Sequence, residues 1–211
     1  MLADTGLALV TSKLTFGPAT QCAGWWFPRQ PLAGYFTSAQ AQAAGFSRPL
    51  VAYQTRSGRF LHIAHGLYRL AQFPHSPLED LYVAWLRAGP AAVISHKSAL
   101  AVYGLSDHLP SRTHLIVPRT ASRRRVGVQL HSHRLRRDEI THRESMPLTT
   151  VPRTLIDVAV SGLAVEFVVQ AIQEALQRGL TTAEQLRRYA DRRGGRGAEL
   201  MRKALVQMGS R

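Results

Sequence analysis

The chain has little of several residue types that usually define a site. Its 211 residues include one cysteine, Cys22, which excludes an internal disulfide and a cysteine-based zinc site. No apolar run approaches the roughly 20 residues that a membrane-spanning helix needs. The N-terminus shows no secretory signal led by basic residues. These absences favour a protein of a reducing compartment, and we expect the cytoplasm.

Acidic residues are also scarce, and lysine is scarcer still. Thirteen acids stand against 27 lysines and arginines, giving a formal charge of +14 and a pI near 11.2. Only Lys13, Lys97 and Lys203 are lysines. This balance predicts a polyanionic partner, either nucleic acid or an acidic protein. Arginine suits bidentate contacts with phosphate and guanine, although a GC-rich genome produces the same bias.

The positive charge is concentrated in two zones. Residues 35–75 contain four arginines and no acid, and residues 111–145 contain nine arginines against three acids. The segment between them is slightly negative, so two separate basic surfaces are expected.

The first basic zone has the pattern of two short helices. Thr37 or Ser38 can cap the first helix, and Gly45 can adopt the positive φ that ends it. Ser47 can cap the second helix, with Pro49 in its first turn, where a missing N–H costs nothing. Two helices joined by a short glycine-containing turn form a helix-turn-helix unit.

A hairpin is predicted to follow the two helices. His65-Gly66 separates two apolar segments as a two-residue turn, and the hairpin would serve as a wing. We therefore predict a winged helix-turn-helix at residues 35–74, with an irregular segment at residues 1–34 packed against it. Residues near the start of the second helix would enter the major groove. The residues predicted to contact DNA are Thr37, Ser38, Ser47, Arg48, Tyr53, Arg56, Arg59, His62 and Arg69.

Residues 75–211 are predicted to form a second domain of mixed α/β character. Apolar periodicity predicts helices at 78–88, 95–103, 152–160, 164–178, 182–192 and 196–208. Strands are predicted at HLIVP, at VGVQLHSH, near 139–143 and at 146–150. The expected fold class is therefore α+β.

Several polar groups in this second domain have alternative interpretations. His131 and His133 would share one face of a strand, and His96, His114 or His142 could add a third metal ligand. We favour hydrogen-bonded or surface histidines, because no carboxylate has a convincing spacing. Ser95-His96 is interpreted as a helix cap beside a buried histidine.

Basic residues of the second domain are candidates for a contact with DNA or with an acidic partner. One arginine is an exception. Arg153 lies one helical turn from Asp157, and the two residues are predicted to form a structural ion pair. The possible additional contacts with a polyanion or an acidic partner are Arg123, Arg124, Arg125, Arg134, Arg136 and Arg137, and the first three are placed in a turn between two strands.

Several separated motifs resemble one family, the AbiEi-type antitoxins of bacterial toxin–antitoxin systems. In order they are GFSRP, HGLYRL, AGPAAVISHKSALAVYGL, HLIVPR, LTTVPRTLIDVA and EALQRGL, spread over residues 35–185. The resemblance implies an N-terminal winged helix-turn-helix and a C-terminal antitoxin domain. In that family the positions of Gln54 and Thr55 are usually apolar, so this chain departs from the pattern there.

The resemblance also implies a function. The protein would bind inverted repeats in operator DNA, repress its own operon and counteract a nucleotidyltransferase-type toxin. We expect no catalytic site, metal, cofactor or membrane association. Two alternatives stay open: a metal-dependent nucleic-acid hydrolase that uses the histidine-rich strands, and a protein-interaction antitoxin that no longer reads DNA.

Overall fold

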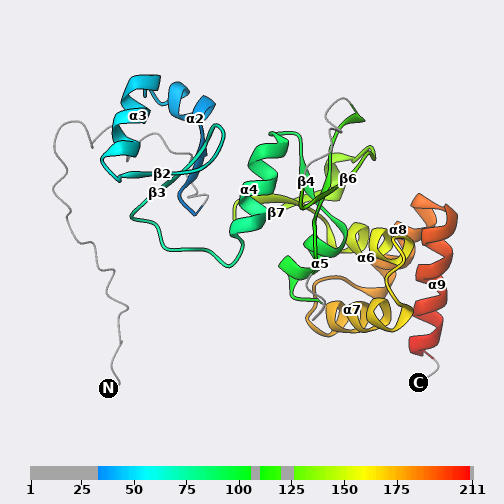
Figure 1. The fold of residues 1–211 in the computed structure, drawn as a ribbon. Helices are drawn as coiled ribbons and strands as arrows, with labels where there is room; N and C mark the ends of the chain where they lie inside the picture. The colour runs from blue at the N-terminus through cyan, green and yellow to red at the C-terminus, as the bar shows by residue number, and fades with distance from the viewer. Residues whose placement is uncertain (1–32, 106–109, 120–125, 210–211) are drawn as a thin grey trace, which may run out of the picture.

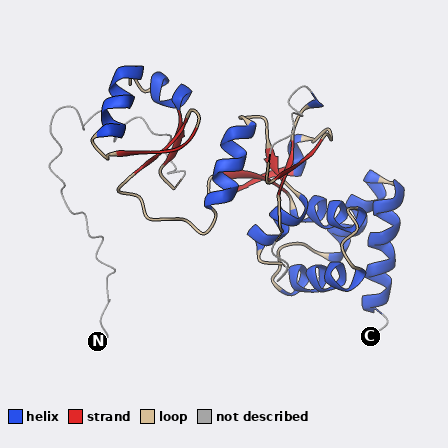
Figure 2. Ribbon diagram, in the orientation of Figure 1, coloured by secondary structure: helices blue, strands red, loops and turns tan. Residues whose placement is uncertain are grey.

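The computed structural model describes residues 33–105, 110–119 and 126–209. These residues form eight helices and two sheets, so the predicted α+β class is confirmed (Figures 1 and 2). In this part of the chain, every helix is too short or too polar to span a bilayer. The segment predicted at 1–34 lies almost entirely outside the described residues.

Residues 33–73, here called the small unit, contain two helices and one sheet. The strands follow the order β1-β3-β2, and both pairings are antiparallel. The elements are β1 (Tyr35–Thr37), α2 (Ser38–Ala43), α3 (Arg48–Arg56), β2 (Phe60–Ala64) and β3 (Leu67–Leu70).

Local hydrogen bonds explain where the two helices begin and end. Thr37 and Gln40 form a capping box at α2, and the Ser47 hydroxyl accepts a 3.3 Å hydrogen bond from the N–H of Leu50 at α3. Gly45 has φ +83°, a backbone conformation that is strained for a residue with a side chain. The predicted caps and the predicted turn are confirmed.

Each face of the small sheet packs against different elements. Phe36, Phe46, Val51 and Phe60 form a core under α2 and α3, with the Phe36 and Phe60 rings 4.9 Å apart. On the other face Tyr35 stacks on Tyr82 of α4 at 5.9 Å. In Figure 1, α4 accordingly lies between the small unit and the second sheet.

Residues 79–209, here called the large unit, are built on a five-stranded sheet in the order β6-β5-β4-β8-β7. The β4–β8 and β5–β6 pairings are parallel, and the other two are antiparallel. The strands are β4 (Val93–Ile94), β5 (Thr113–Ile116), β6 (Val128–His131), β7 (Ile140–Arg143) and β8 (Met146–Thr149).

The helices of the large unit gather mainly toward its C-terminal end (Figure 1). α6 contacts α5, α7, α8 and α9, and its residues from Val151 to Val158 are all buried apart from Pro152. The helices are α4 (Glu79–Ala88), α5 (His96–Tyr103), α6 (Val151–Val160), α7 (Val165–Gln177), α8 (Ala183–Arg193) and α9 (Gly195–Gly209), with a 3-10 turn at Arg137–Glu139.

Two features differ from the sequence-based predictions, and one further prediction falls outside the described residues. β1 and β4 were not predicted, because segments of three and two residues carry no alternation and form only by pairing with their partners. β5 and β6 are parallel, so a tight turn cannot connect them. Arg123, Arg124 and Arg125, predicted in such a turn, lie outside the described residues.

Candidate functional site

The exposed face of α3 carries the strongest candidates for DNA contact. Arg48, Ala52 and Arg56 are spaced four residues apart, so they lie on one side of the helix, and all three are exposed. Tyr53 beside them is 57% exposed. The opposite side contains buried Val51 and Gln54 and faces the small core. A large exposed tyrosine between two arginines forms a basic, aromatic surface.

The hydroxyl groups predicted to contact DNA serve the local fold. The Thr37 hydroxyl accepts from the N–H of Gln40 at 3.2 Å, and the Ser47 hydroxyl caps α3. The backbone N–H of Ser38 donates to the carbonyl of Gly66 at 2.8 Å, which ties α2 to the hairpin turn. Thr37 and Ser38 therefore hold α2 and the hairpin turn, and Ser47 holds the start of α3, whereas Arg48, Tyr53 and Arg56 present exposed side chains.

The hairpin presents only some of its predicted contacts. Arg59 and His62 are exposed, but Arg69 is 4% exposed. Alternation along β3 directs Arg69 to the face opposite Tyr68, and its Nη2 lies 3.3 Å from Nε2 of His75 in the segment before α4. The prediction that Arg69 contacts DNA is therefore withdrawn.

The two polar residues at usually apolar positions of α3 behave differently. The Thr55 hydroxyl donates to the carbonyl of Val51 at 2.8 Å. Gln54 is 8% exposed, and its Oε1 has no hydrogen-bond partner among the described residues. A buried amide oxygen without a donor weakens the packing of α3 on its core.

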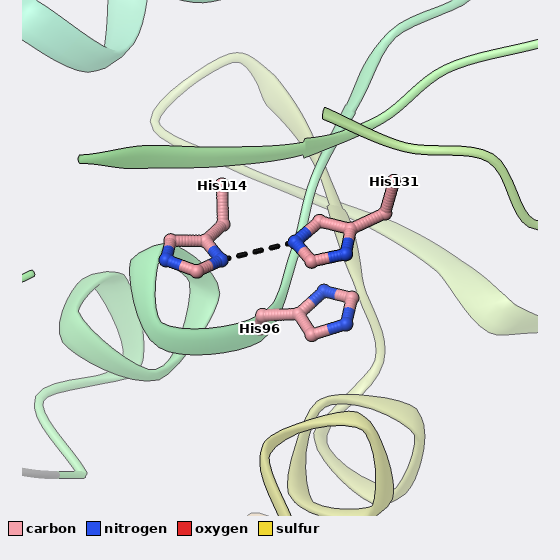
Figure 3. Close-up of side chains that lie close together, drawn as sticks. All are labelled: His96, His114 and His131. Carbon is pink, nitrogen blue, oxygen red and sulfur yellow. Dashed lines mark hydrogen bonds between the residues drawn. The ribbon is translucent and has the colours of Figure 1, made fainter. Parts of the chain in front are cut away.

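A histidine cluster lies on the large unit, formed by three separate elements. His96 begins α5, His114 lies on β5, and His131 ends β6 (Figure 3). One ring nitrogen from each lies within 4.8 Å of the others, and Nδ1 of His114 is 3.0 Å from Nε2 of His131. His133 lies farther away, with its ring centroid 6.4 Å from that of His96.

The environment of the cluster keeps its imidazoles uncharged. Burial, with the neighbouring imidazoles, lowers the pKa of His96 to about 2 and the pKa values of His114 and His131 to about 4. Sequence spacing placed His131 and His133 together and left the third member open. In the structure His96 and His114 join His131 in the cluster, whereas His142 lies on β7, at the opposite edge of the sheet.

A buried ionic network connects three other elements of the large unit. Arg153 of α6 is fully buried and donates to Asp157 at 2.6 Å and to Glu139 at 3.3 Å. The Tyr189 hydroxyl of α8 also donates to Glu139. Burial alone raises the pKa of Glu139, but these bonds and the N–H of Arg136 outweigh it, so the pKa is lowered. The predicted Arg153–Asp157 pair is confirmed.

The comparisons with known proteins identify the small unit. Residues 30–71 match the model of the family described as "Transcriptional regulator, AbiEi antitoxin". The AbiEi resemblance is confirmed over this segment. The match spans α2, α3 and the β2–β3 hairpin, and it includes Arg48, Tyr53 and Arg56.

A solved structure resembles the fold of the whole chain. The crystal structure of the RV2827C protein from Mycobacterium tuberculosis has a TM-score of 0.52 and 14% sequence identity, covering 89% of this chain and 75% of that one. At this identity the likeness concerns the fold alone. No curated protein matches the sequence.

Outside the AbiEi segment, a cleft of about 210 Å³ collects several arginines. Arg134 and Arg136, predicted as polyanion contacts, line it, whereas Arg137 is exposed and does not. Asp138 pairs with Arg136 at 3.2 Å and with an arginine of α8 at 3.0 Å, which offsets part of the charge. The full lining is Arg134, Arg136, Glu139, Tyr189, Arg192 and Arg193.

Proposed function

We propose that this protein is an antitoxin that binds operator DNA through a winged helix-turn-helix formed by the small unit. The observation that supports this proposal is the AbiEi match over residues 30–71. This segment includes α3, whose exposed side presents Arg48, Tyr53 and Arg56. The small unit also contains no acid to repel phosphate.

In this proposal the side chains have different tasks. α3 would lie in the major groove, where Arg48 and Arg56 can donate two hydrogen bonds each to guanine edges. Arg59 and His62, exposed at the hairpin, would contact phosphates and fix the register without reading sequence. Two copies would bind an inverted repeat, one per half-site.

The same protein would repress its own operon and counteract a nucleotidyltransferase-type toxin. This proposal rests on the family match, because antitoxin function accompanies transcriptional regulation in the family's description. The arginine-lined cleft of the large unit is the proposed toxin contact, since it lies outside the AbiEi segment and retains basic side chains at its surface.

The test is binding to the DNA upstream of the protein's own gene, compared with a scrambled sequence of equal length. Arg48→Ala and Arg56→Ala should each weaken operator binding roughly ten-fold or more, because a lost base contact costs about 1–3 kcal/mol. Arg188→Ala is the matched control, since Arg188 is 69% exposed on α8 of the large unit.

Two results would separate the parts of this proposal. Operator binding that is equal in wild type and both α3 variants contradicts DNA reading by this helix. Toxin neutralisation that survives in the α3 variants assigns neutralisation to other residues, and the Arg134→Ala, Arg136→Ala double variant then tests the cleft.

A further inference from the structure

The histidine cluster has no role in DNA reading, because it lies on the large unit, away from α3. Its members come from the start of α5 and from two neighbouring parallel strands, so the fold brings them together from distant parts of the sequence (Figure 3). His96 is 5% exposed, and His114 and His131 are half-buried. The cluster therefore has an enclosed side and a side open to small solutes.

The spacing of the nitrogens fits a single ion. Two imidazole ligands of a tetrahedral zinc, each at about 2.0–2.1 Å, hold their nitrogens roughly 3.3 Å apart. Nδ1 of His114 and Nε2 of His131 are 3.0 Å apart, and a nitrogen of His96 lies within 4.8 Å of both. Rotation of the side chains, including a tilt of His96 and His131 out of their stacked arrangement, would bring all three nitrogens to coordination distance.

The surroundings prepare the ligands in two ways. All three side chains are imidazoles, a common zinc ligand, and they are held in a buried or half-buried setting at the end of the sheet. The Ser95 hydroxyl lies 2.9 Å from Nδ1 of His96, which fits the partner that a ligating imidazole ordinarily has at its other nitrogen. His96 also has φ +50°, an uncommon backbone conformation for a residue with a side chain.

We propose that His96, His114 and His131 together bind one zinc ion, or a divalent transition metal with the same preference for imidazole. The stacked rings of His96 and His131, with centroids 3.6 Å apart, tilt on binding so that each ring plane contains the metal. Three protein ligands leave one position of a tetrahedral ion for water. The bound ion joins the start of α5 to the edge of the five-stranded sheet.

The experiment uses the full chain, stripped of metal with a chelator and dialysed. Zinc is titrated against a chromophoric competitor, and cobalt is added separately to observe the visible absorption of a tetrahedral site. We expect one equivalent bound and a higher midpoint of thermal unfolding with zinc. His114→Ala and His131→Ala should each weaken zinc binding at least ten-fold and remove the cobalt spectrum.

The matched control is His142→Ala, an exposed histidine on β7 at the other edge of the same sheet. It should bind zinc as wild type does. His114→Gln, which keeps a polar side chain of similar length, serves if an alanine variant does not fold. Zinc binding of equal strength in wild type and folded cluster variants would overturn the proposal, as would a wild type that takes up no stoichiometric zinc.

Discussion

At the residue scale, Gln54 shows how one side chain can weaken the packing of a helix, here α3. It lies on the inner side of α3 with an amide oxygen that has no donor among the described residues. Leucine has a similar size and needs no hydrogen bond, so it would remove an unsatisfied group and add apolar contact.

Gln54→Leu should therefore raise the free energy of unfolding by about 1 kcal/mol, measured by urea denaturation. Gln42→Leu is the control, because Gln42 is exposed on α2, and its replacement should change stability by less than about 0.5 kcal/mol. An equal effect of both substitutions would show that the gain comes from helix propensity alone.

Arg153 is the opposite case, a buried side chain whose loss removes the cation shared by Glu139 and Asp157, although Arg193 still lies 3.6 Å from Asp157. Arg153→Met should lower the free energy of unfolding by about 3–5 kcal/mol, because Glu139 and Asp157 then lose their buried cation. The measurement is again urea denaturation, which gives the free energy of unfolding.

Arg188→Met is the comparison for this variant. Arg188 is also paired with an acid one helical turn away, Glu184, but at 3.7 Å and with both side chains largely exposed. Its replacement should cost less than about 1 kcal/mol. Similar losses in the two variants would contradict the burial argument.

The residue pattern predicted part of this network and missed the rest. The i,i+4 spacing of Arg153 and Asp157 is visible in sequence because a helix brings those positions together. Glu139 and Tyr189 come from η2 and α8, so only the tertiary packing of three elements could place them beside Arg153.

At the element scale, α6 and α9 of the large unit pack closely at a glycine. A Cβ built at Gly197 of α9 would lie 2.7 Å from Cγ2 of Ile156 and 2.9 Å from Cγ2 of Val160, both on α6. The two helices approach closely because this position has no side chain.

Gly197→Ala therefore sets helix propensity against packing. Alanine should favour an exposed helix by about 1 kcal/mol, while a forced contact in a packed core costs about 1–3 kcal/mol. We expect a net loss of stability, measured as a lower midpoint of thermal unfolding, whereas Glu199→Ala on the exposed side should have little effect. A stabilised Gly197→Ala variant would show that α6 and α9 can separate at no cost.

Elements with strong local signals were predicted well. The caps at Thr37 and Ser47 depend on residues three apart, and the structure contains both, whereas Ser95 stands at the N-cap of α5 without a side-chain capping hydrogen bond. The parallel pairing of β5 with β6 has no such signal, because it depends on a long connection and on neighbouring strands. The histidine cluster depends on that pairing, which explains why spacing alone did not reveal it.

At the scale of the whole molecule, the contribution of the overall charge of +14 to DNA affinity should be separable from the contribution of α3 by varying the salt concentration. If Arg59 neutralises about one phosphate in each bound copy, it should contribute roughly −0.9 per copy to the log–log slope of operator affinity against salt. Arg59→Ala should reduce the magnitude of this slope by about 0.9 per copy and leave the preference for operator over scrambled DNA unchanged.

A much steeper slope, shared by scrambled DNA, would have a different meaning. It would assign binding to the overall basic charge, including the arginines of the large unit, and it would contradict reading by α3. Fluorescence anisotropy at several salt concentrations distinguishes the two results.

The strand order of the large unit also affects when each unit can fold during synthesis on the ribosome. β4 pairs with β8 through Ile94 and Leu148, so this sheet cannot close until a long stretch of chain has left the ribosome. All pairings of the small unit join strands between Tyr35 and Leu70. Because local contacts form sooner than distant ones and domains fold as units during synthesis, the small unit can fold while the rest is still being translated. A nascent chain could then present its arginine-bearing helix before the histidine cluster exists.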